Sequence, residues 1–229
     1  MSSAAKVCVV TGGSSGVGAA VAERFFAAGY HVVTCSRGSV SADLNRSGLL
    51  RISRQVDVAE PQALTTFLQT TLAEQGRIDV LVNNAGNAPR KALTETTLAE
   101  LDDTVAVHIR ATFLATQLVW PAMDRQGGGT IVNISSMASI APLPGFSVYG
   151  GCKAWINTFT RAIAAEGKPH NIRAFALALG AVDTPLLRRV APEFDPAAAL
   201  QPAAVAELVL ELADEKMRPL SGETLPLTA

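Results

Sequence analysis

The stretch KVCVVTGGSSGVG, residues 6–18, decides the fold class of this chain. Its first half, Lys6–Thr11, is a short β-branched run typical of a buried strand, and its second half leads directly into a helical pattern at 16–28. Glycines allow a tight turn and a close approach of the backbone to a pyrophosphate, while the helix N-terminus supplies unpaired N–H groups. Such a turn can also serve only to pack a helix against a strand. Because it lies between the first strand and the first helix, we interpret it as part of a nucleotide-binding site.

Short apolar runs alternate with longer helical patterns along the rest of the chain. The further predicted strands cover residues 31–35, 78–82, 130–134 and 172–177, with weaker candidates at 50–56 and 223–226. The further predicted helices cover residues 61–75, 97–125, 148–167 and 203–214. Apolar strands that alternate with helices predict right-handed parallel crossovers. We therefore expect an α/β fold with a doubly wound parallel sheet of about seven strands, helices on both faces and a ligand site beyond the carboxyl ends of the strands.

Length and composition exclude several other classes of protein. We expect residues 1–229 to form a single domain, because this length fits one and no repeat, low-complexity tract or long linker divides the chain. Apolar residues make up 48% and charged residues only 17%, which supports a sizeable core and excludes a disordered chain. The 19 basic and 20 acidic residues give a net charge of −1, so we expect neither nucleic-acid nor membrane-surface binding.

The cysteines and histidines indicate a reducing compartment and no metal. Cys8, Cys35 and Cys152 are an odd number without a Cys-x-x-Cys pair, which favours buried thiols over a disulfide framework. The three histidines lack the spacing of metal ligands. Uncharged stretches are too short to span a bilayer, and the first residues lack the long apolar region of a signal peptide. We therefore predict a cytoplasmic, metal-free protein.

The residues after the second predicted strand bear on the choice of cofactor. Sites that prefer NAD often have an acidic residue here for the ribose hydroxyls, but this chain has Ser36 and Arg37. No carboxylate is present to repel a 2′-phosphate, and the Arg37 guanidinium could pair with one. A solvated surface arginine is the alternative interpretation. The sequence favours NADP(H) over NAD(H).

Tyr149 and Lys153 are the strongest candidates for chemistry. They stand four residues apart at the start of a helical pattern, so both face the same side. A phenol has a pKa of about 10, and an ammonium one turn away lowers that pKa by stabilising the phenolate. Tyr149 could then donate a proton to a carbonyl, although Tyr-x-x-x-Lys alone is usually an ordinary helix face. Ser135 and Ser136 end a predicted strand, where a hydroxyl can donate to a substrate oxygen or merely form a turn.

In their order and spacing these motifs resemble the short-chain dehydrogenase/reductase family, NAD(P)-dependent oxidoreductases with the Rossmann fold, over nearly the whole chain. The matching motifs are Thr11-Gly-Gly-Ser-Ser-Gly-Val-Gly18, Asp57-Val58, Asn83-Asn84-Ala85-Gly86, Ser136, Tyr149-Gly-Gly-Cys-Lys153 and Gly180-Ala-Val-Asp-Thr184. The resemblance implies an enzyme that interconverts a carbonyl and an alcohol by hydride transfer, with Tyr149 as acid or base. Ser136, rather than Ser135, would polarise the carbonyl, and Lys153 would also hold the nicotinamide ribose.

The resemblance also implies most of the cofactor contacts. Asp57 and Val58 match the adenine-contact position, residues 83–86 match the turn that supports the cofactor, and Val182 and Thr184 match positions that contact the carboxamide and the phosphates. With the glycine turn and Arg37 included, the candidate cofactor-binding residues are Gly12, Ser14, Ser15, Gly16, Val17, Gly18, Ser36, Arg37, Asp57, Val58, Asn84, Ala85, Gly86, Tyr149, Lys153, Gly180, Val182 and Thr184.

Three positions depart from the family pattern. His108 occupies the position of the catalytic asparagine, and Phe175 and Leu179 stand where the family has an asparagine and a proline after the sixth strand. The family asparagine helps to keep a water that connects the lysine to bulk solvent. An imidazole could hold such a water, or relay protons itself because it titrates near neutrality. If His108 only packs, the relay is impaired, and the chain would be a catalytically impaired relative that senses NAD(P) or binds a partner.

The segment at about 185–201 is the predicted substrate loop. It carries the apolar residues Leu186, Leu187, Val190 and Phe194, and Met137 and Phe146 would lie near the same opening. Such a loop can exclude water and contact the substrate, or it can simply cover part of the core. We expect a small-molecule carbonyl or alcohol substrate that is apolar or mixed, without a fixed charge requirement.

The helical patterns at 97–125 and 148–167 carry more apolar residues than one sheet face needs. Part of this surface could form an interface between subunits, since dimers and tetramers are common in the family that the chain resembles. We therefore expect a homodimer or homotetramer. Deep burial of these residues against the sheet is the alternative interpretation.

Overall fold

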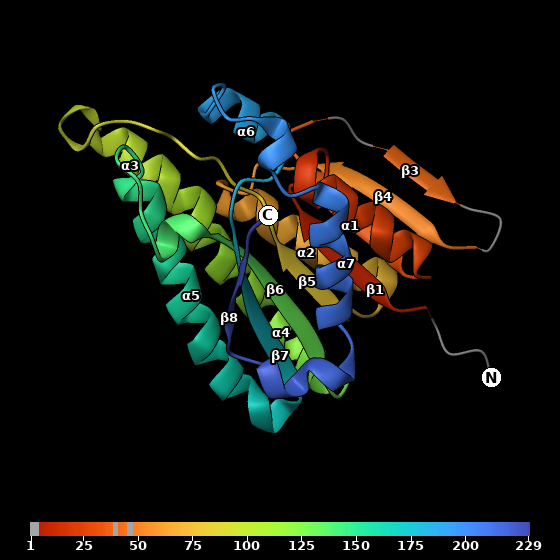
Figure 1. Ribbon diagram of the computed structural model, residues 1–229. Helices are drawn as coiled ribbons and strands as arrows, with labels where there is room; N and C mark the ends of the chain where they lie inside the picture. Colours follow the sequence, from red (N-terminus) through yellow and green to blue (C-terminus); the bar gives the residue numbers. More distant parts are fainter. Residues whose placement is uncertain (1–4, 39–40, 45–47) are drawn as a thin grey trace.

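A computed structural model describes residues 5–38, 41–44 and 48–229. Over these residues the strands form one eight-stranded sheet in the order β3-β4-β2-β1-β5-β6-β7-β8 (Figure 1). The strands are β1 Val7–Thr11, β2 His31–Ser36, β3 Ser41–Leu44, β4 Leu50–Gln55, β5 Val80–Asn83, β6 Gly129–Ser136, β7 Ile172–Leu179 and β8 Thr224–Leu227. Seven of them are parallel, as predicted. β3 pairs with β4 in antiparallel fashion and was not predicted, because its four residues lack an apolar run.

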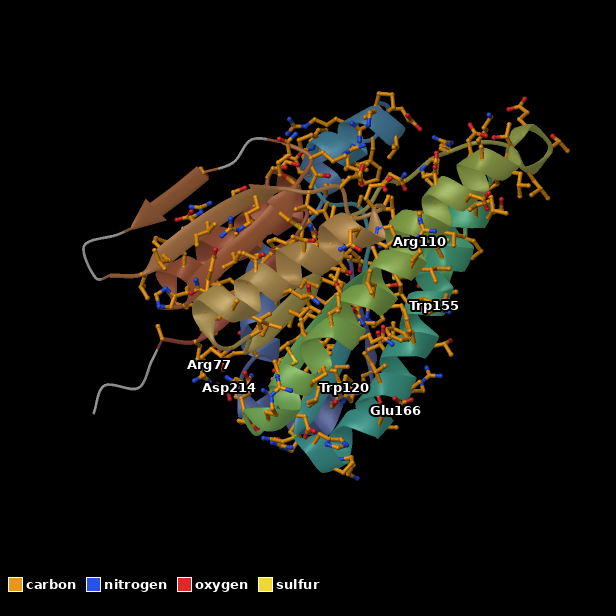
Figure 2. All side chains as sticks on the ribbon, turned by 180° about the vertical axis from the view of Figure 1, so that it is seen from behind. Arg77, Arg110, Trp120, Trp155, Glu166 and Asp214 are labelled. Atoms are coloured by element: carbon orange, nitrogen blue, oxygen red, sulfur yellow. The ribbon has the colours of Figure 1, made fainter. Side chains whose placement is uncertain are left out.

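Helices cover both faces of the sheet. They are α1 Gly16–Ala27, α2 Pro61–Gln75, α3 Leu98–Val105, α4 Ala111–Arg125, α5 Ser147–Gly167, α6 Pro185–Val190 and α7 Pro202–Leu212. The helices α1 and α7 pack together on one face, and α2, α4 and α5 lie on the other, as the view from behind shows (Figure 2). Alternate residues of a strand therefore belong to different cores. Val9 lies in the core between the sheet and the helices α2 and α4, and Val10 lies in the core between the sheet and α1. Burial of both faces explains why the strands read as continuous apolar runs.

The predicted helix at 97–125 is in fact three consecutive segments. Between α3 and α4 lies a π-helical turn, Ala106–Arg110, with the candidate residue His108 at its centre. A π-helical turn adds one residue to the helix repeat and so changes the face on which a side chain emerges; such turns often occur at functional sites. The apolar period of the sequence did not reveal this interruption.

Phe175 and Leu179 both lie within β7, not after it: Phe175 falls inside the predicted strand at 172–177, and Leu179 is included because β7 is two residues longer than predicted. Both side chains are buried in the core on the side of α1 and α7. In place of the family asparagine and proline, the chain therefore has two core residues in a strand paired on both sides.

The predicted substrate loop begins with the short helix α6 and returns to the sheet at Leu200. The amide of Leu200 donates to the carbonyl of Ala181 at 2.9 Å, and the amide of Asp183 donates to the carbonyl of Leu200 at 2.9 Å. These bonds fix the base of the loop, while α6 projects beyond the carboxyl edge of the sheet (Figure 1). No helix in the described part of the chain is long and apolar enough to cross a membrane. All three cysteines are buried and unpaired, as predicted.

Candidate active site

The glycine turn is held to the neighbouring strand by backbone hydrogen bonds. The amides of Gly12 and Gly13 donate to the carbonyl of Cys35 at 2.8 and 3.1 Å. Ser15 precedes α1 in extended conformation, and both Ser14 and Ser15 are exposed. The N-terminus of a twelve-residue helix thus opens toward solvent at the carboxyl edge of the sheet, which is the arrangement that binds phosphates.

Gly18 allows α1 to approach the turn closely. A Cβ atom at Gly18 would lie 2.2 Å from the carbonyl oxygen of Gly12 and 2.4 Å from Nδ2 of Asn84. The same Asn84 amide group donates to the carbonyls of Thr11 and Gly12 at 2.9 and 3.1 Å. Asn84, directly after β5, therefore braces the turn that follows β1, and only glycine fits at residue 18.

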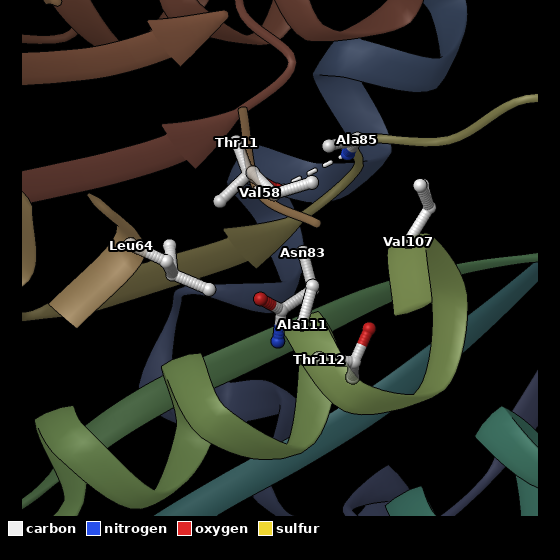
Figure 3. A pocket seen from close by; sticks show the side chains of 8 residues that line it. All are labelled: Thr11, Val58, Leu64, Asn83, Ala85, Val107, Ala111 and Thr112. Atoms are coloured by element: carbon white, nitrogen blue, oxygen red, sulfur yellow. Dashed lines mark hydrogen bonds between the residues drawn. The ribbon is translucent and has the colours of Figure 1, made fainter. Parts of the chain in front are cut away.

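Other loops complete this edge of the sheet. The Thr11 hydroxyl oxygen accepts from the amide of Ala85 at 3.1 Å, and a Cβ atom at Gly16 would lie 3.0 Å from Cγ2 of Thr184. A small pocket opens between β1, β5 and α4 (Figure 3). It is lined by Thr11, Val58, Leu64, Asn83, Ala85, Val107, Ala111 and Thr112. The structure thus brings together the loops after β1, β5 and β7, which carry most of the predicted cofactor residues.

The other end of the predicted cofactor site lies after β2 and β4. Arg37 directly follows β2, its side chain is exposed, and it forms no ion pair within the described residues. Asp57 accepts a hydrogen bond from the amide of Ala59 at 2.9 Å, so its carboxylate shapes the turn after β4. Val58 is buried beside this turn. As far as the described residues show, the Arg37 guanidinium is available to a ligand.

Tyr149, Ser136 and Lys153 meet at the carboxyl end of β6. Burial raises the pKa of Tyr149, and its hydrogen bond with Ser136 opposes this shift. The sequence predicted a lowered pKa, but burial of the phenol outweighs the other effects. Nζ of Lys153 donates to the carbonyl of Ile134 at 2.7 Å and lies 5.7 Å from the centre of the Tyr149 ring. Burial lowers the pKa of Lys153 to about 8.

Ser135 and Ser136 are clearly distinguished. The Ser135 hydroxyl is buried and donates to the backbone carbonyl of Lys153 at 3.2 Å, which ties β6 to α5. Ser136 is less buried and accepts from the amide of Ala138 at 3.1 Å in addition to its contact with Tyr149. Only the Ser136 hydroxyl lies where it could also reach a substrate oxygen.

His108 lies against Tyr149 and is almost fully buried. The two rings meet edge to face with their centres 5.5 Å apart. Nε2 of His108 lies 2.9 Å from the backbone oxygen and 3.0 Å from Oδ1 of Asn87, two atoms that only accept, so Nε2 carries the proton. These contacts are shorter than the 3.4 Å approach of the Asn87 amide nitrogen and decide the tautomer. Nδ1 is left as a buried acceptor without a partner among the described residues.

Burial also sets the charge of His108. It lowers the pKa of the imidazole to about 3, and the positive charge of Lys153 adds to this effect. Gly86 makes room for the ring, since a Cβ atom there would lie 2.7 Å from Cε1 of His108. Asn87, which fixes the ring, was not among the predicted site residues, although it directly follows the motif at 83–86.

A hollow of about 500 Å³ lies beside the first turns of α5. Its lining is mostly apolar and consists of Ala138, Ser139, Pro142, Leu143, Pro144, Gly145, Ser147, Gly150, Gly151 and Ala154. The predicted loop residues Leu186, Leu187 and Val190 are half-buried, and Phe194 is exposed. Phe146 is near the site as predicted, with its ring centre 5.9 Å from that of Tyr149.

The fold and this arrangement of loops define a protein of the Rossmann type, and comparisons with known proteins agree. The family model of the short chain dehydrogenases matches residues 6–194. The chain is 34% identical to 2-(R)-hydroxypropyl-CoM dehydrogenase of Xanthobacter autotrophicus, over 96% of each chain. It is 31% identical to the 3-oxoacyl-[acyl-carrier-protein] reductase of Thermotoga maritima, over 96% of this chain and 95% of that protein.

Solved structures give the same result. The 3-ketoacyl-(acyl-carrier-protein) reductase of Brucella melitensis, complexed with NADH, is 27% identical with a TM-score of 0.86, over 97% of this chain and 96% of that one. The aldohexose dehydrogenase of Thermoplasma acidophilum is 27% identical with a TM-score of 0.87, over 97% of this chain and 92% of that one. The chain belongs to the short-chain dehydrogenase/reductase family of oxidoreductases, which confirms the predicted family, fold and enzyme class.

Proposed function

We propose that this protein is an NADP(H)-dependent oxidoreductase in which Tyr149 exchanges the proton with a substrate carbonyl or alcohol. The observation that carries this proposal is the contact of the Tyr149 hydroxyl with Ser136, beside the buried ammonium of Lys153. These groups lie at the same edge of the sheet as the glycine turn. A phenol, a hydroxyl and an ammonium together can donate a proton, polarise a carbonyl and stabilise the charge that results.

The residues present fit a dinucleotide. The close contact of Gly18 with Gly12 keeps side chains out of the turn, and the N-terminus of α1 can hold the pyrophosphate. Arg37 and Ser36 could hold the 2′-phosphate, Asp57 and Val58 would flank the adenine, and Lys153 could hold the nicotinamide ribose. The remaining contacts would come from Asn84, Ala85 and Gly86 after β5, and from Gly180, Val182 and Thr184 after β7. A bound nicotinamide supplies the hydride.

In the reducing direction, the Tyr149 phenol gives its proton to the substrate oxygen while Ser136 donates a hydrogen bond to the same oxygen. The raised pKa of Tyr149 keeps the phenol protonated before the reaction. The Lys153 ammonium then stabilises the phenolate that forms. His108 acts here as a neutral acceptor, whose Nδ1 can hold a water toward Lys153, and not as a proton carrier, because its pKa is too low.

The decisive experiment follows the consumption of NADPH with a panel of ketones, aldehydes and quinones. Wild-type protein should reduce at least one class, and Tyr149→Phe should abolish this activity while still binding NADPH. Activity that survives the substitution would contradict the role of Tyr149. NADPH binding without turnover of any compound would favour the alternative, a catalytically impaired NAD(P) sensor with the relay interrupted at His108.

We also propose a homo-oligomer that assembles through an aromatic face of α4 and α5. Trp155, labelled on α5 in Figure 2, stacks on Phe159 with ring centres 4.6 Å apart, and Phe113 lies 6.3 Å from Phe159 and is 45% exposed. Phe113 is exposed and the other two rings are half-buried, so the cluster offers aromatic surface of the kind that is enriched at protein interfaces. We further propose a cytoplasmic location, a single domain over residues 1–229 and a substrate loop at about 185–201.

A further inference from the structure

Arg90 lies where three segments around the mouth of the candidate site meet. It belongs to the loop between β5 and α3, and its Nη1 donates to Oε1 of Glu193, in the segment after α6, at 2.8 Å. Its guanidinium carbon lies 5.9 Å from the centre of the Phe146 ring, at the start of α5. Segments far apart in the sequence are thus joined near α6, which projects beyond the carboxyl edge of the sheet (Figure 1).

The Phe146 ring links the guanidinium to the reacting groups. Its centre lies 5.9 Å from the guanidinium carbon of Arg90 and 5.9 Å from the centre of the Tyr149 ring. One aromatic ring thus contacts both the positive charge and the phenol. A small molecule whose carbonyl is at Tyr149 could extend past this ring, so that a group at its far end meets Arg90.

The backbone directs Arg90 toward this place. The amide of Lys91 donates to the carbonyl of Gly145 at 2.8 Å, which fixes the loop against the segment before α5. Gly145 has φ of +87°, and a Cβ atom there would lie 3.0 Å from Cγ of Arg90. Glycine at 145 thus leaves room for the aliphatic part of the Arg90 side chain. The Arg90 guanidinium makes a cation–π contact with the Phe146 ring.

The ion pair of Arg90 is weaker than its neighbours' pairs. Lys91 makes two hydrogen bonds to Glu100, and Arg188 makes two to Asp183. Arg90 makes one, to Glu193, and among the described residues its other N–H donors have no partner. Both side chains are well exposed, 49% for Arg90 and 63% for Glu193, so the pair exchanges readily.

We propose that Arg90 determines substrate specificity by binding a carboxylate of the compound that reacts at Tyr149. The Glu193 carboxylate accepts from the Arg90 guanidinium at the position that a substrate carboxylate would take. A substrate carboxylate can displace Glu193 by accepting two parallel hydrogen bonds in place of one. The substrate class is then an oxo or hydroxy acid, whereas the sequence predicted an apolar or mixed substrate without a fixed charge requirement. This inference rests on the proposed function, because it places the carbonyl at Tyr149.

The test compares linear oxo acids of increasing length with their methyl esters. We expect wild-type enzyme with NADPH to prefer the acids, and Arg90→Gln to lower kcat/KM for the acids by about ten- to a hundredfold, mainly through KM. The value for the esters should stay close to that of the wild type. Glu193→Gln, which removes the internal competitor, should lower KM for the acids alone. Arg125→Gln, which removes an equal charge from an exposed position in the last turn of α4, outside the proposed site, should leave the preference unchanged.

Three results would overturn the role of Arg90: no preference for acids in the wild type, an unchanged preference in Arg90→Gln, or an equal loss in Arg125→Gln. A binding experiment distinguishes failure of this specificity proposal from failure of the proposed function. Oxo acids and esters are titrated calorimetrically into NADPH-loaded Tyr149→Phe. Selective binding of acids without turnover by the wild type would uphold Arg90 and contradict the oxidoreductase mechanism. Equal binding of acids and esters, or none, would overturn the specificity proposal alone.

Discussion

Burial sets the charge of the ionisable side chains at the centre of the site. The pKa of Lys153 falls only to about 8, so at neutral pH it keeps its proton, whereas that of His108 falls to about 3, so it is neutral. Of these two groups, only Lys153 is positively charged beside Tyr149, and the histidine does not compete with it. The departure from the family asparagine introduces no second cation at the site.

His108 gives a stability prediction with a definite sign. Its pKa is about 3 when folded, and about 6.5 when unfolded, so the unfolded chain takes up a proton first as the pH falls. This contribution to the free energy of unfolding is therefore present above pH 6.5 and is lost as the pH falls toward 3, by at most about 1.4 kcal/mol per pH unit.

Urea denaturation from about pH 7 to about pH 5 measures this loss. Wild-type protein should lose stability more steeply than His108→Asn, which has no imidazole to protonate. Parallel curves would contradict a neutral, buried His108. In the same variant, the pH profile of activity should keep its shape, because a side chain that stays neutral contributes no titration; a shifted profile would instead support a proton relay.

Arg37 gives a prediction for cofactor choice. In Arg37→Asp, a carboxylate would face the 2′-phosphate, and we expect kcat/KM with NADPH to fall by about ten- to a hundredfold while that with NADH falls less. Arg37→Lys keeps the positive charge but lacks the planar guanidinium, so its kcat/KM with NADPH should lie between that of the wild type and that of Arg37→Asp. Initial rates with each cofactor measure the preference. Equal use of both cofactors by the wild type would contradict the proposed preference for NADP(H).

The contact between α1 and the glycine turn gives a prediction about helix placement. A methyl group at Gly18 would collide with the Gly12 carbonyl, which cannot move aside, so Gly18→Ala should displace α1 and lower NADPH affinity by about tenfold or more. The matched control is Gly151→Ala, because a Cβ atom at Gly151 meets no heavy atom within 4 Å among the described residues. It should keep affinity and gain some helix stability. Fluorescence titration with NADPH compares them, and equal affinities would refute the steric argument.

The strands and longer helices could be predicted from the sequence because burial on both faces of the sheet leaves uninterrupted apolar runs. The short strand β3, the helix α6 and the π-helical turn at His108 could not, because they depend on pairing and packing with distant segments. The same holds for the site. Tyr149, Lys153 and Ser136 form recognisable local patterns, whereas Asn87 and Arg90 gain their importance only from contacts made in the folded chain, such as that of Arg90 with Glu193.

For the molecule as a whole, the aromatic face of α4 and α5 predicts self-association. We expect wild-type protein to elute as a dimer or tetramer at micromolar concentration, and Trp155→Arg to shift it toward the monomer by placing an unpaired charge in the interface. Leu93→Arg changes an apolar residue that is 72% exposed elsewhere and should leave the mass unchanged. Size-exclusion chromatography with light scattering measures the mass, and a monomeric wild type would contradict the proposed interface.

The brace that Asn84 provides to the glycine turn has a consequence for biosynthesis. A nascent polypeptide that has left the ribosome only as far as the end of α2 already contains the glycine turn. It does not yet contain Asn84, whose side-chain amide holds the turn, or Thr184, which packs against Gly16. We expect the ability to retain a pyridine nucleotide to arise late in translation, after β7 has joined the sheet. The nucleotide would then stabilise only finished molecules, and its cellular concentration would influence how many of them escape proteolysis.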